Sequence, residues 1–591
     1  MARHSMFKVL APLGFFCALL HDAKAWEVKD MNPLDLRKPT GELEVPCGAA
    51  DCTLKIYYFK GKNFDSHRKN ILNIPGGPGT IVDPAHRGFP QKFEPDYNVY
   101  YLYVRGNGPS IVGIDKDNDK LLRAKYVADD IEALRRKELG GKSWDAIYAH
   151  SWGTIVAQLY AKNHGKVAKL VLSGSVSRRE NYELNRIAML RRNLETIYEN
   201  YSRSVCSLTN LNSRRAAGAI ADDFCFLSGD QRSMITKRLT EMLKEFQSSY
   251  GSVGFVTRYF KELKRDEKEF REKFPYPEEF FLALGGLGNF GAINFGAKET
   301  MGKEFSFKGD QINSALVIGY YLSLKKEDLA AGEEKPCETA PFFNRIRGAA
   351  HQLYCNAFNE AKDNFGERGS TTSIRAREVF AVFDGLNRSN FVMLRQVGLL
   401  DENQCFSADD VKRFAESQAP NVSTVARELL KKIGTTTAPN EGPVCPWDPG
   451  KFKHNVPTLL LKGGADATTA GCQAEDFFNF GLDGQRVLIE FPGQGHLVPP
   501  PLALVSEGVP NVPGQGHPRP LPLALRRDGS PNEGQDNYVE LIKLFLTKST
   551  AKDFINDQRT KKMMDSLKAT KHFGDGSNDH VLCKKIGRID D

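Results

Sequence analysis

The sequence predicts an α/β protein with a mostly parallel sheet, helices on both faces and a long helical insertion. Strand-like and helix-like segments alternate between residues 52 and 174. The alternation stops after Val176 and resumes at Val456–Lys462 and Arg486–Phe491. The intervening stretch to Pro446 is mainly helical and poor in strands. These observations indicate one α/β unit that is split by about 270 residues.

In the first part of this unit, short apolar runs end at glycine, proline or charged residues, as buried strands do. A helix is expected over 124–139 because Val127, Ile131 and Leu134 share one face, and a second helix over Ile155–Asn163. The expected strands are Leu54–Phe59, Asn70–Ile74, Asn98–Val104, Trp144–Ala149 and Ala168–Leu172.

The later elements follow the same logic. Met234–Leu243 is an amphipathic helix of the insertion, and Tyr538–Leu546 fits the last helix of the α/β unit. The tail beyond Thr550 is polar and charged. The predicted organisation is a targeting segment (1–25), a first α/β part (26–175), a helical cap (176–446) and a second α/β part with the tail (447–591).

The N-terminal segment has the three parts of a secretory signal. Arg3 and Lys8 are basic, Val9–Leu20 is apolar, and Ala23 and Ala25 are the small residues that a signal peptidase recognises. We expect cleavage after Ala25 and export to a periplasm or to the medium. The alternative is a short N-terminal anchor. No other stretch reaches about 18 uninterrupted apolar residues, so we expect no membrane association after signal removal.

Composition narrows the possible partners. Hydrophobic residues make up 41% and charged residues 26% of the chain, which is typical of globular proteins. The net charge of +8 is spread along the sequence, without a Lys/Arg block, a zinc-finger pattern or an RNA-recognition pattern. We therefore expect no nucleic-acid partner. The oligomeric state stays open.

The cysteines fit an exported protein. Ten remain after signal removal, and an even number in an oxidising compartment indicates up to five disulfides. Spacing makes Cys47–Cys52, Cys206–Cys225 and Cys337–Cys355 plausible local pairs but leaves the connectivity open. Since no pair has the CxxC spacing, we expect no metal site.

Residues 149–153, Ala-His-Ser-Trp-Gly, lie between an expected strand and an expected helix. This is the context of a nucleophile elbow, in which a serine projects from a tight turn between small residues. Ser151 is the candidate nucleophile, and the backbone N–H of Trp152 is a candidate oxyanion donor. The alternative is an incidental serine in a strand-to-helix turn.

Residues 75–79, Pro-Gly-Gly-Pro-Gly, follow an earlier strand. Glycines let backbone N–H groups face a substrate oxygen without side-chain obstruction. Gly77 is therefore the second candidate oxyanion donor, although the segment alone could be a structural turn.

The candidate acid and base come later in the chain, each after a strand. Asp466 follows the strand that ends at Lys462, and His496 follows the strand that ends at Phe491. His496 would accept the serine proton, and Asp466 would orient and stabilise the imidazole. Asp476 and Asp483 are weaker alternatives because neither directly follows a strand.

One repeat bears on the histidine. The Pro-Gly-Gln-Gly-His of residues 492–496 recurs at 513–517. His517 lacks a preceding strand and is followed by Pro518, so we assign the base to His496 and expect the second copy to be a surface loop.

Together these residues resemble the α/β-hydrolase family, in particular its prolyl iminopeptidase and tripeptidyl aminopeptidase branch. The branch's HGGPG loop corresponds to residues 75–79, its D-x-R-G-x-G-x-S turn to 103–110, and its G-x-S-Y-G-T elbow to 149–154. Tyr103 replaces the aspartate of that turn. The similarity covers roughly residues 43–176 and 456–547.

The resemblance implies an α/β-hydrolase fold with a large helical cap and a serine aminopeptidase acting on short peptides, without a cofactor. Glu278 and Glu279 are candidates to bind a substrate ammonium, although solvated acids at a helix start are the simpler interpretation. Two alternatives remain. One is an esterase or lipase using the same triad, and the other is a non-catalytic binding protein on a hydrolase scaffold.

Overall fold

The computed structural model describes the α/β unit and part of the insertion. The signal-like segment, the ten cysteines, Gly77, Glu278, Glu279 and His517 lie outside the described residues. The described residues are 39–46, 53–76, 89–105, 110, 124–176, 182–205, 229–250, 284, 287, 288, 318, 322, 453–469, 473–496, 533–567 and 569–574.

The described strands form one nine-stranded sheet, in the order β1-β2-β4-β3-β5-β6-β7-β8-β9. Neighbours from β4 to β8 are parallel, whereas the pairs β1/β2, β2/β4 and β8/β9 are antiparallel. The mostly parallel sheet predicted from the sequence is confirmed. The strands are β1 (Gly41–Pro46), β2 (Thr53–Lys60), β3 (Asn70–Ile74), β4 (Asn98–Leu102), β5 (Ala146–His150), β6 (Leu170–Ser173), β7 (Thr458–Gly463), β8 (Arg486–Phe491) and β9 (Thr570–Gly574).

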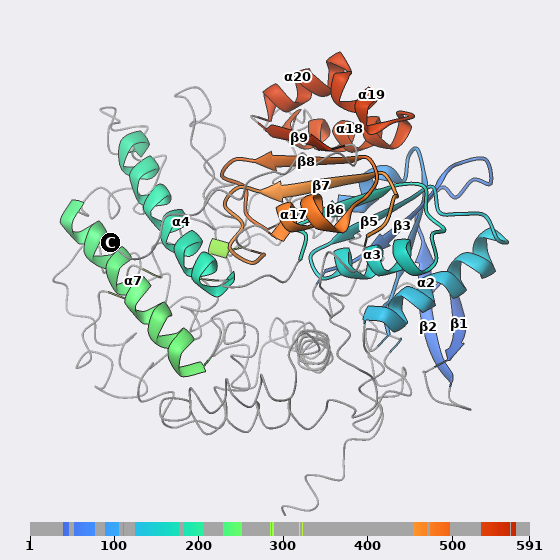
Figure 1. The fold of residues 1–591 in the computed structure, drawn as a ribbon, viewed down its shortest axis with the longest axis horizontal. Coiled ribbons are helices and arrows are strands. Elements are labelled where there is room, and N and C mark those ends of the chain that lie inside the picture. Colours follow the sequence, from blue (N-terminus) through green and yellow to red (C-terminus); the bar gives the residue numbers. More distant parts are fainter. Residues whose placement is uncertain are drawn as a thin grey trace, which may run out of the picture.

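Helices cover both faces of this sheet (Figure 1). The α-helices are α2 (Ala124–Leu139), α3 (Gly153–Asn163), α4 (Tyr182–Val205), α7 (Gly229–Tyr250), α17 (Gln473–Asp476), α18 (Glu533–Thr547), α19 (Ala551–Asn556) and α20 (Gln558–Ser566). Two short turns complete the described elements, the 3-10 turn η2 (Phe89–Phe93) and the π-helical turn η7 (Phe477–Gly481).

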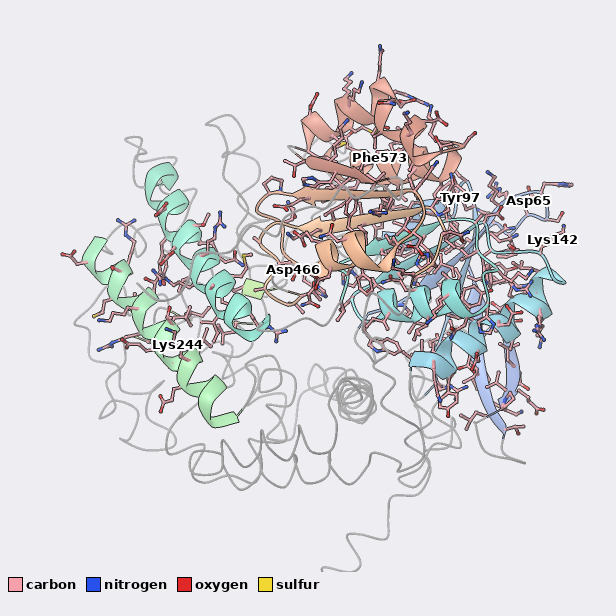
Figure 2. The ribbon with its side chains drawn as sticks, viewed as in Figure 1. Asp65, Tyr97, Lys142, Lys244, Asp466 and Phe573 are labelled. Carbon is pink, nitrogen blue, oxygen red and sulfur yellow. The ribbon has the colours of Figure 1, made fainter. Side chains whose placement is uncertain are left out.

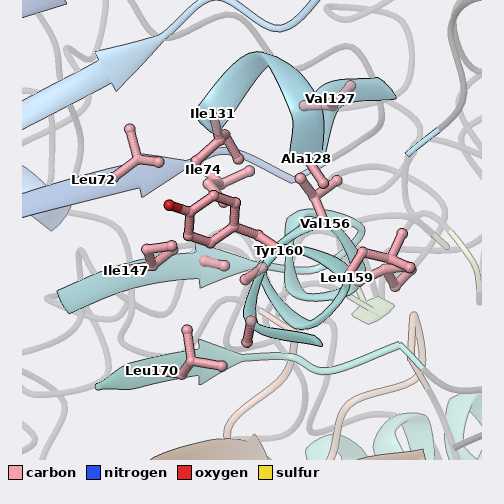
Figure 3. Packing of buried hydrophobic residues seen from close by; sticks show 14 of the residues in the cluster. Leu72, Ile74, Val127, Ala128, Ile131, Ile147, Val156, Leu159, Tyr160 and Leu170 are labelled. Atoms are coloured by element: carbon pink, nitrogen blue, oxygen red, sulfur yellow. The ribbon is translucent and has the colours of Figure 1, made fainter. Parts of the chain in front are cut away.

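Successive side chains of each central strand point to opposite faces of the sheet and form two hydrophobic cores. Leu72, Ile74 and Ile147 face α2 and α3 (Figure 3). Their neighbours Ile71 and Tyr148 point the other way, into the layer formed with α18, α19 and α20. Because the central strands are buried on both faces, they read as continuous apolar runs, which is why the sequence identified them.

The sheet is continuous across the long interruption. Leu170 of β6 pairs with Thr458 of β7, so two strands far apart in sequence lie side by side. Helices α4 and α7 follow β6 in the chain and pack against each other beside the sheet (Figure 1). Their buried side chains recur at helical spacing, as with Ile235, Leu239 and Leu243 of α7, the helix predicted over Met234–Leu243. No helix in the described part of the chain is long and apolar enough to cross a membrane.

The C-terminal region corrects one prediction, because α18 is not the last helix. Thr550 and Asp553 form a reciprocal capping box that begins α19, and the Asp557 side chain accepts hydrogen bonds from the first turn of α20. Strand β9 then pairs with β8 at the edge of the sheet. The polar composition hid these elements because only a few side chains, such as Phe554 and Met564, are buried.

The turn after β4 contains a buried ion pair that the sequence did not predict. Tyr103 occupies the position of the aspartate in the similar family, but Arg105 still has an acidic partner. Its guanidinium forms a two-point ion pair with Asp130 of α2, with Nε to Oδ2 at 2.8 Å, and both side chains are 1% exposed. This pair holds the turn after β4 against α2.

Candidate active site

Ser151 lies in a sharp turn between β5 and α3. Its φ angle of 52° is in the left-handed region, which non-glycine residues rarely adopt. Its N–H donates to Ser173 O at 2.8 Å, extending the β5/β6 ladder by one bond. Its carbonyl accepts from the N–H and the hydroxyl of Thr154, at 2.9 and 2.6 Å. This strained, multiply held backbone is the geometry of a nucleophile elbow.

Two glycines let the chain pack tightly around this turn. A Cβ on Gly153 would lie 2.5 Å from Pro75 O, and one on Gly76 would lie 2.8 Å from Ser151 Cβ. Side chains at these positions would push the turn after β3 away from Ser151. The Pro-Gly turn predicted from the sequence therefore does lie against the serine.

Of the two candidate oxyanion donors, Trp152 lies within the described residues and Gly77 does not. Trp152 follows Ser151 at the start of α3, and its backbone N–H donates no hydrogen bond to another described residue. That N–H is available to a substrate oxygen, and the helix N-terminus adds a favourable field for negative charge. Gly77 lies outside the described residues, one position beyond Gly76.

Asp466 lies in the turn after β7, at the carboxyl edge of the sheet (Figure 2). Its Oδ1 accepts the N–H groups of Thr468 and Thr469, both at 2.8 Å, and its Oδ2 accepts the Thr469 hydroxyl at 2.5 Å. Burial by itself raises the pKa of Asp466, but the nearby His496 and these hydrogen bonds hold that pKa below its ordinary value. The carboxylate is therefore ionised and fixed in direction.

His496 follows β8 and meets this carboxylate. Its Nδ1 lies 2.9 Å from Asp466 Oδ2 and 3.2 Å from Thr469 Oγ1. With Nδ1 held, Nε2 is the nitrogen left for proton transfer. The ring also lies against Gly174, where a Cβ would be 2.9 Å from Nδ1. Gly174 directly follows Ser173, whose carbonyl accepts the Ser151 N–H, so the base and the candidate nucleophile share one strand end.

The two alternative acids lie elsewhere. Asp476 ends α17, and Asp483 precedes β8, where it forms an ion pair with Lys453 at 3.3 Å. Of the three candidate aspartates, Asp466 is the one that bonds His496.

The sequence did not predict that His150 packs on the candidate base. Its imidazole packs on that of His496 with ring centroids 4.8 Å apart, and its Nδ1 lies 3.2 Å from Ser173 Oγ. Burial, together with the nearby His496, lowers the pKa of His150 to about 3, so this ring is neutral at ordinary pH. Thr469 was missed as well. A Thr three residues after the candidate acid could have suggested its role.

The described residues contain no cluster of His, Cys, Asp or Glu that could hold a metal ion. What the site can do follows from its groups. It has a hydroxyl on a strained turn, an imidazole oriented by an ionised carboxylate, and an N–H group beside the hydroxyl. This set suits nucleophilic attack on a carbonyl with transient negative charge on its oxygen.

Comparison with protein families agrees with this geometry. The family model described as alpha/beta hydrolase fold matches residues 69–204, which include β3, β4, α2, β5 and Ser151. The chain has the α/β-hydrolase fold. Comparison with the curated proteins finds no match.

Several solved structures are similar at low identity. A thermophilic esterase from Thermogutta terrifontis is 16% identical, with a TM-score of 0.20, and the match covers 31% of this chain and 64% of that chain. VinJ is 11% identical, with a TM-score of 0.33 and coverage of 78% and 92%. A proline iminopeptidase-related protein from Thermus thermophilus is 12% identical, with a TM-score of 0.29 and coverage of 77% and 90%.

Proposed function

We propose that this chain is a serine hydrolase with Ser151 as nucleophile, His496 as general base and Asp466 as the acid that orients it. One observation carries the proposal. The strained turn that presents Ser151 lies at the same sheet edge as the bonded His496–Asp466 pair. The left-handed backbone of Ser151 costs roughly 1–2 kcal/mol, which is typical of strain kept at a functional site.

The first half of the proposed reaction forms an acyl-enzyme. The Ser151 hydroxyl attacks the substrate carbonyl while its proton passes to Nε2 of His496. Asp466 stabilises the imidazolium through the 2.9 Å bond to Nδ1. The developing oxyanion accepts a hydrogen bond from the Trp152 N–H. The best candidate for the second donor is the backbone N–H of Gly77.

The second half of the reaction returns the serine. His496 gives its proton to the leaving amine or alcohol, then accepts one from the water that attacks the acyl carbonyl. Ser151 recovers its hydrogen as the acid product leaves. No metal or organic cofactor takes part in these steps.

We further propose that the substrates are short peptides cleaved from the N-terminus. The support is the set of motifs shared with prolyl iminopeptidases and tripeptidyl aminopeptidases, above all the Pro-Gly-Gly-Pro-Gly segment at 75–79. The long insertion after β6 would limit the length of the substrate. An esterase remains the alternative because Ala149 replaces the first glycine of the elbow, a variant that also occurs in bacterial lipases.

Export is part of the proposal, with cleavage after Ala25 and disulfides among the remaining cysteines. N-terminal sequencing of the mature protein and mass spectrometry with and without reductant test both points. An intact N-terminus after expression in a secreting host would reject cleavage.

The activity is tested with a matched substrate panel on the wild type and Ser151→Ala. The panel contains prolyl and Ala-Ala-Phe aminoacyl-amides, their N-blocked versions and a short-chain nitrophenyl ester. We expect cleavage of the free-amine peptides, little cleavage of the blocked ones, and loss of activity by a factor of about 10⁴ or more in the variant. Ser151-dependent cleavage of the ester alone would reject the peptidase and leave the triad in place.

A further inference from the structure

Helix α4 belongs to the insertion, yet it reaches the turns that carry the acid and the base. Two of its side chains, Arg186 and Asn193, are seven residues apart and share one face of the helix. Arg186 donates to Thr468 O at 2.8 Å, and Asn193 donates to Ala465 O at 2.8 Å. Both acceptors are backbone carbonyls within two residues of Asp466.

Asn193 makes a second contact with the same amide group. Its Nδ2 also lies 3.4 Å from Leu287 O, in a segment of the insertion that packs on the acid turn. The next residue, Gly288, accepts the backbone N–H of His496 at 3.3 Å. One buried amide, 1% exposed, therefore connects the turn of the acid with the segment that holds the base.

The acid and base turns also meet directly, but through few bonds. Ala465 N–H donates to Gln494 O at 2.8 Å, and a Cβ on Gly463 would lie 2.0 Å from Gly495 O. This contact fixes how closely the turns approach. The bond from Asn193 to Ala465 O also holds the Asp466 turn, so the 2.9 Å Asp466–His496 distance depends on both contacts.

We propose that Asn193, supported by Arg186, is a positioning residue for the Asp466–His496 pair, so that the insertion takes part in placing the acid against the base. This inference rests on the proposed serine hydrolase. Asn193 touches no reacting atom and acts through the Ala465 carbonyl. Without its donation the Asp466 turn is free to shift, so the carboxylate holds His496 less firmly and stabilises the imidazolium less.

The test measures covalent labelling of Ser151 by a fluorophosphonate probe as a function of pH, which requires no knowledge of the substrate. In this step the Ser151 oxygen bonds to phosphorus, fluoride leaves, and the serine proton passes to His496. The main variant is Asn193→Leu, which keeps the shape of the side chain but donates no hydrogen bond. Arg186→Met removes the other donor. Arg191→Ala, on the same helix in a surface ion pair with Glu195, is the matched control.

We expect Asn193→Leu to label roughly 10 to 100 times more slowly than the wild type, because small misplacements of catalytic groups have effects of this size. The acid limb of its pH profile should move to lower pH, because a displaced Asp466 stabilises the imidazolium less. Arg186→Met should show the same shift with a smaller loss of rate. Arg191→Ala should match the wild type.

A simple loss of folded protein would lower the amplitude of labelling and leave the acid limb where it is. Wild-type rate and profile in Asn193→Leu would overturn the inference while leaving the serine hydrolase intact. Should Asn193→Leu not fold, an unshifted acid limb in Arg186→Met overturns it. A wild type that does not label, or a Ser151→Ala variant that labels equally, rejects the proposed function itself.

Discussion

The imidazole of His150 packs on the imidazole of His496, with ring centroids 4.8 Å apart and planes at 48°. His150 directly precedes Ser151, so the strand that presents the candidate nucleophile also supplies a ring that packs on the candidate base. Asp466 bonds Nδ1 of the same ring, and Gly174 leaves room for it. His496 is thus held by groups from three strand ends, those of β5, β6 and β7.

The first prediction concerns stability in acid. The pKa of His150 is lowered to about 3 in the folded chain, against about 6.5 when unfolded. The unfolded chain therefore takes up a proton as pH falls below 6.5 while folded His150 does not, so this residue destabilises the fold between pH 6.5 and about 3. The wild type should therefore lose unfolding free energy between pH 7 and pH 5. In His150→Asn this loss should be smaller than in the wild type, by at most about 2 kcal/mol.

Urea unfolding of both proteins at the two pH values measures this difference. Asn keeps a polar atom near the position of Nδ1, which contacts Ser173, so the fold should persist. His67→Asn, at an exposed histidine, is the control and should leave the difference unchanged. An equal loss of stability in wild type and His150→Asn would contradict the prediction.

The second prediction concerns Gly174. It has φ +56°, and an added Cβ would lie 2.9 Å from His496 Cε1 and Nδ1. Gly174→Ala should cost roughly 1–2 kcal/mol of stability for the left-handed backbone. Displacement of the imidazole should in addition slow Ser151 labelling by about 100-fold. Labelling kinetics and thermal unfolding separate the two effects.

Gly140→Ala is a close control for that variant. Gly140 has φ +55°, and nothing lies within 4 Å of its added Cβ. It should show a similar loss of stability and no loss of labelling rate. Equal rates in Gly174→Ala and wild type would mean that His496 is not the base.

The third prediction concerns Asp466→Asn. The amide would present a donor to His496 Nδ1 and favour the wrong tautomer, so the rate should fall by about 10⁴-fold at pH 7. Steady-state hydrolysis of the best panel substrate is the measurement. Asp483→Asn, at the alternative acid that pairs with Lys453, should be close to wild type. If Asp483→Asn lowered the rate more than Asp466→Asn, Asp483 and not Asp466 would be the acid that orients His496.

The same substitution has a signature in stability. The pKa of Asp466 is below its ordinary value in the fold, so its ionisation stabilises the chain above that ordinary value of about 3.9. The contribution disappears as pH falls through the lower, folded pKa. Asp466→Asn should therefore be less stable than wild type at pH 7, and the gap should narrow towards pH 3 in denaturant titrations.

The fourth prediction concerns the buried pair Arg105–Asp130. Arg105→Leu alone leaves an uncompensated buried carboxylate and should cost about 3–5 kcal/mol, whereas the double variant Arg105→Leu/Asp130→Leu should recover much of this loss. A double-mutant cycle by urea unfolding measures the coupling. The exposed pair Lys55–Glu42, at 3.2 Å, is the reference and should couple by under about 1 kcal/mol. Equal coupling in the two pairs would contradict the argument.

The sequence by itself determined the central strands, the order of the elements and the positions of Ser151, Asp466 and His496 after three strands. Those elements carry strong local signals, because strands buried on both faces must be apolar throughout and the turns after them need glycine or small residues. Edge strands and polar helices lack such signals. For that reason β1, β9, α19 and α20 were not predicted.

Only the tertiary structure decided which polar groups meet. The partner of Arg105 is on another helix, His150 and Thr469 contact His496 through space, and Asn193 reaches the Asp466 turn from a helix more than 250 residues earlier. Such contacts depend on the packing of distant segments, so no local pattern reports them. Chain order placed the candidate triad on one sheet edge, but folding alone set its distances and supports.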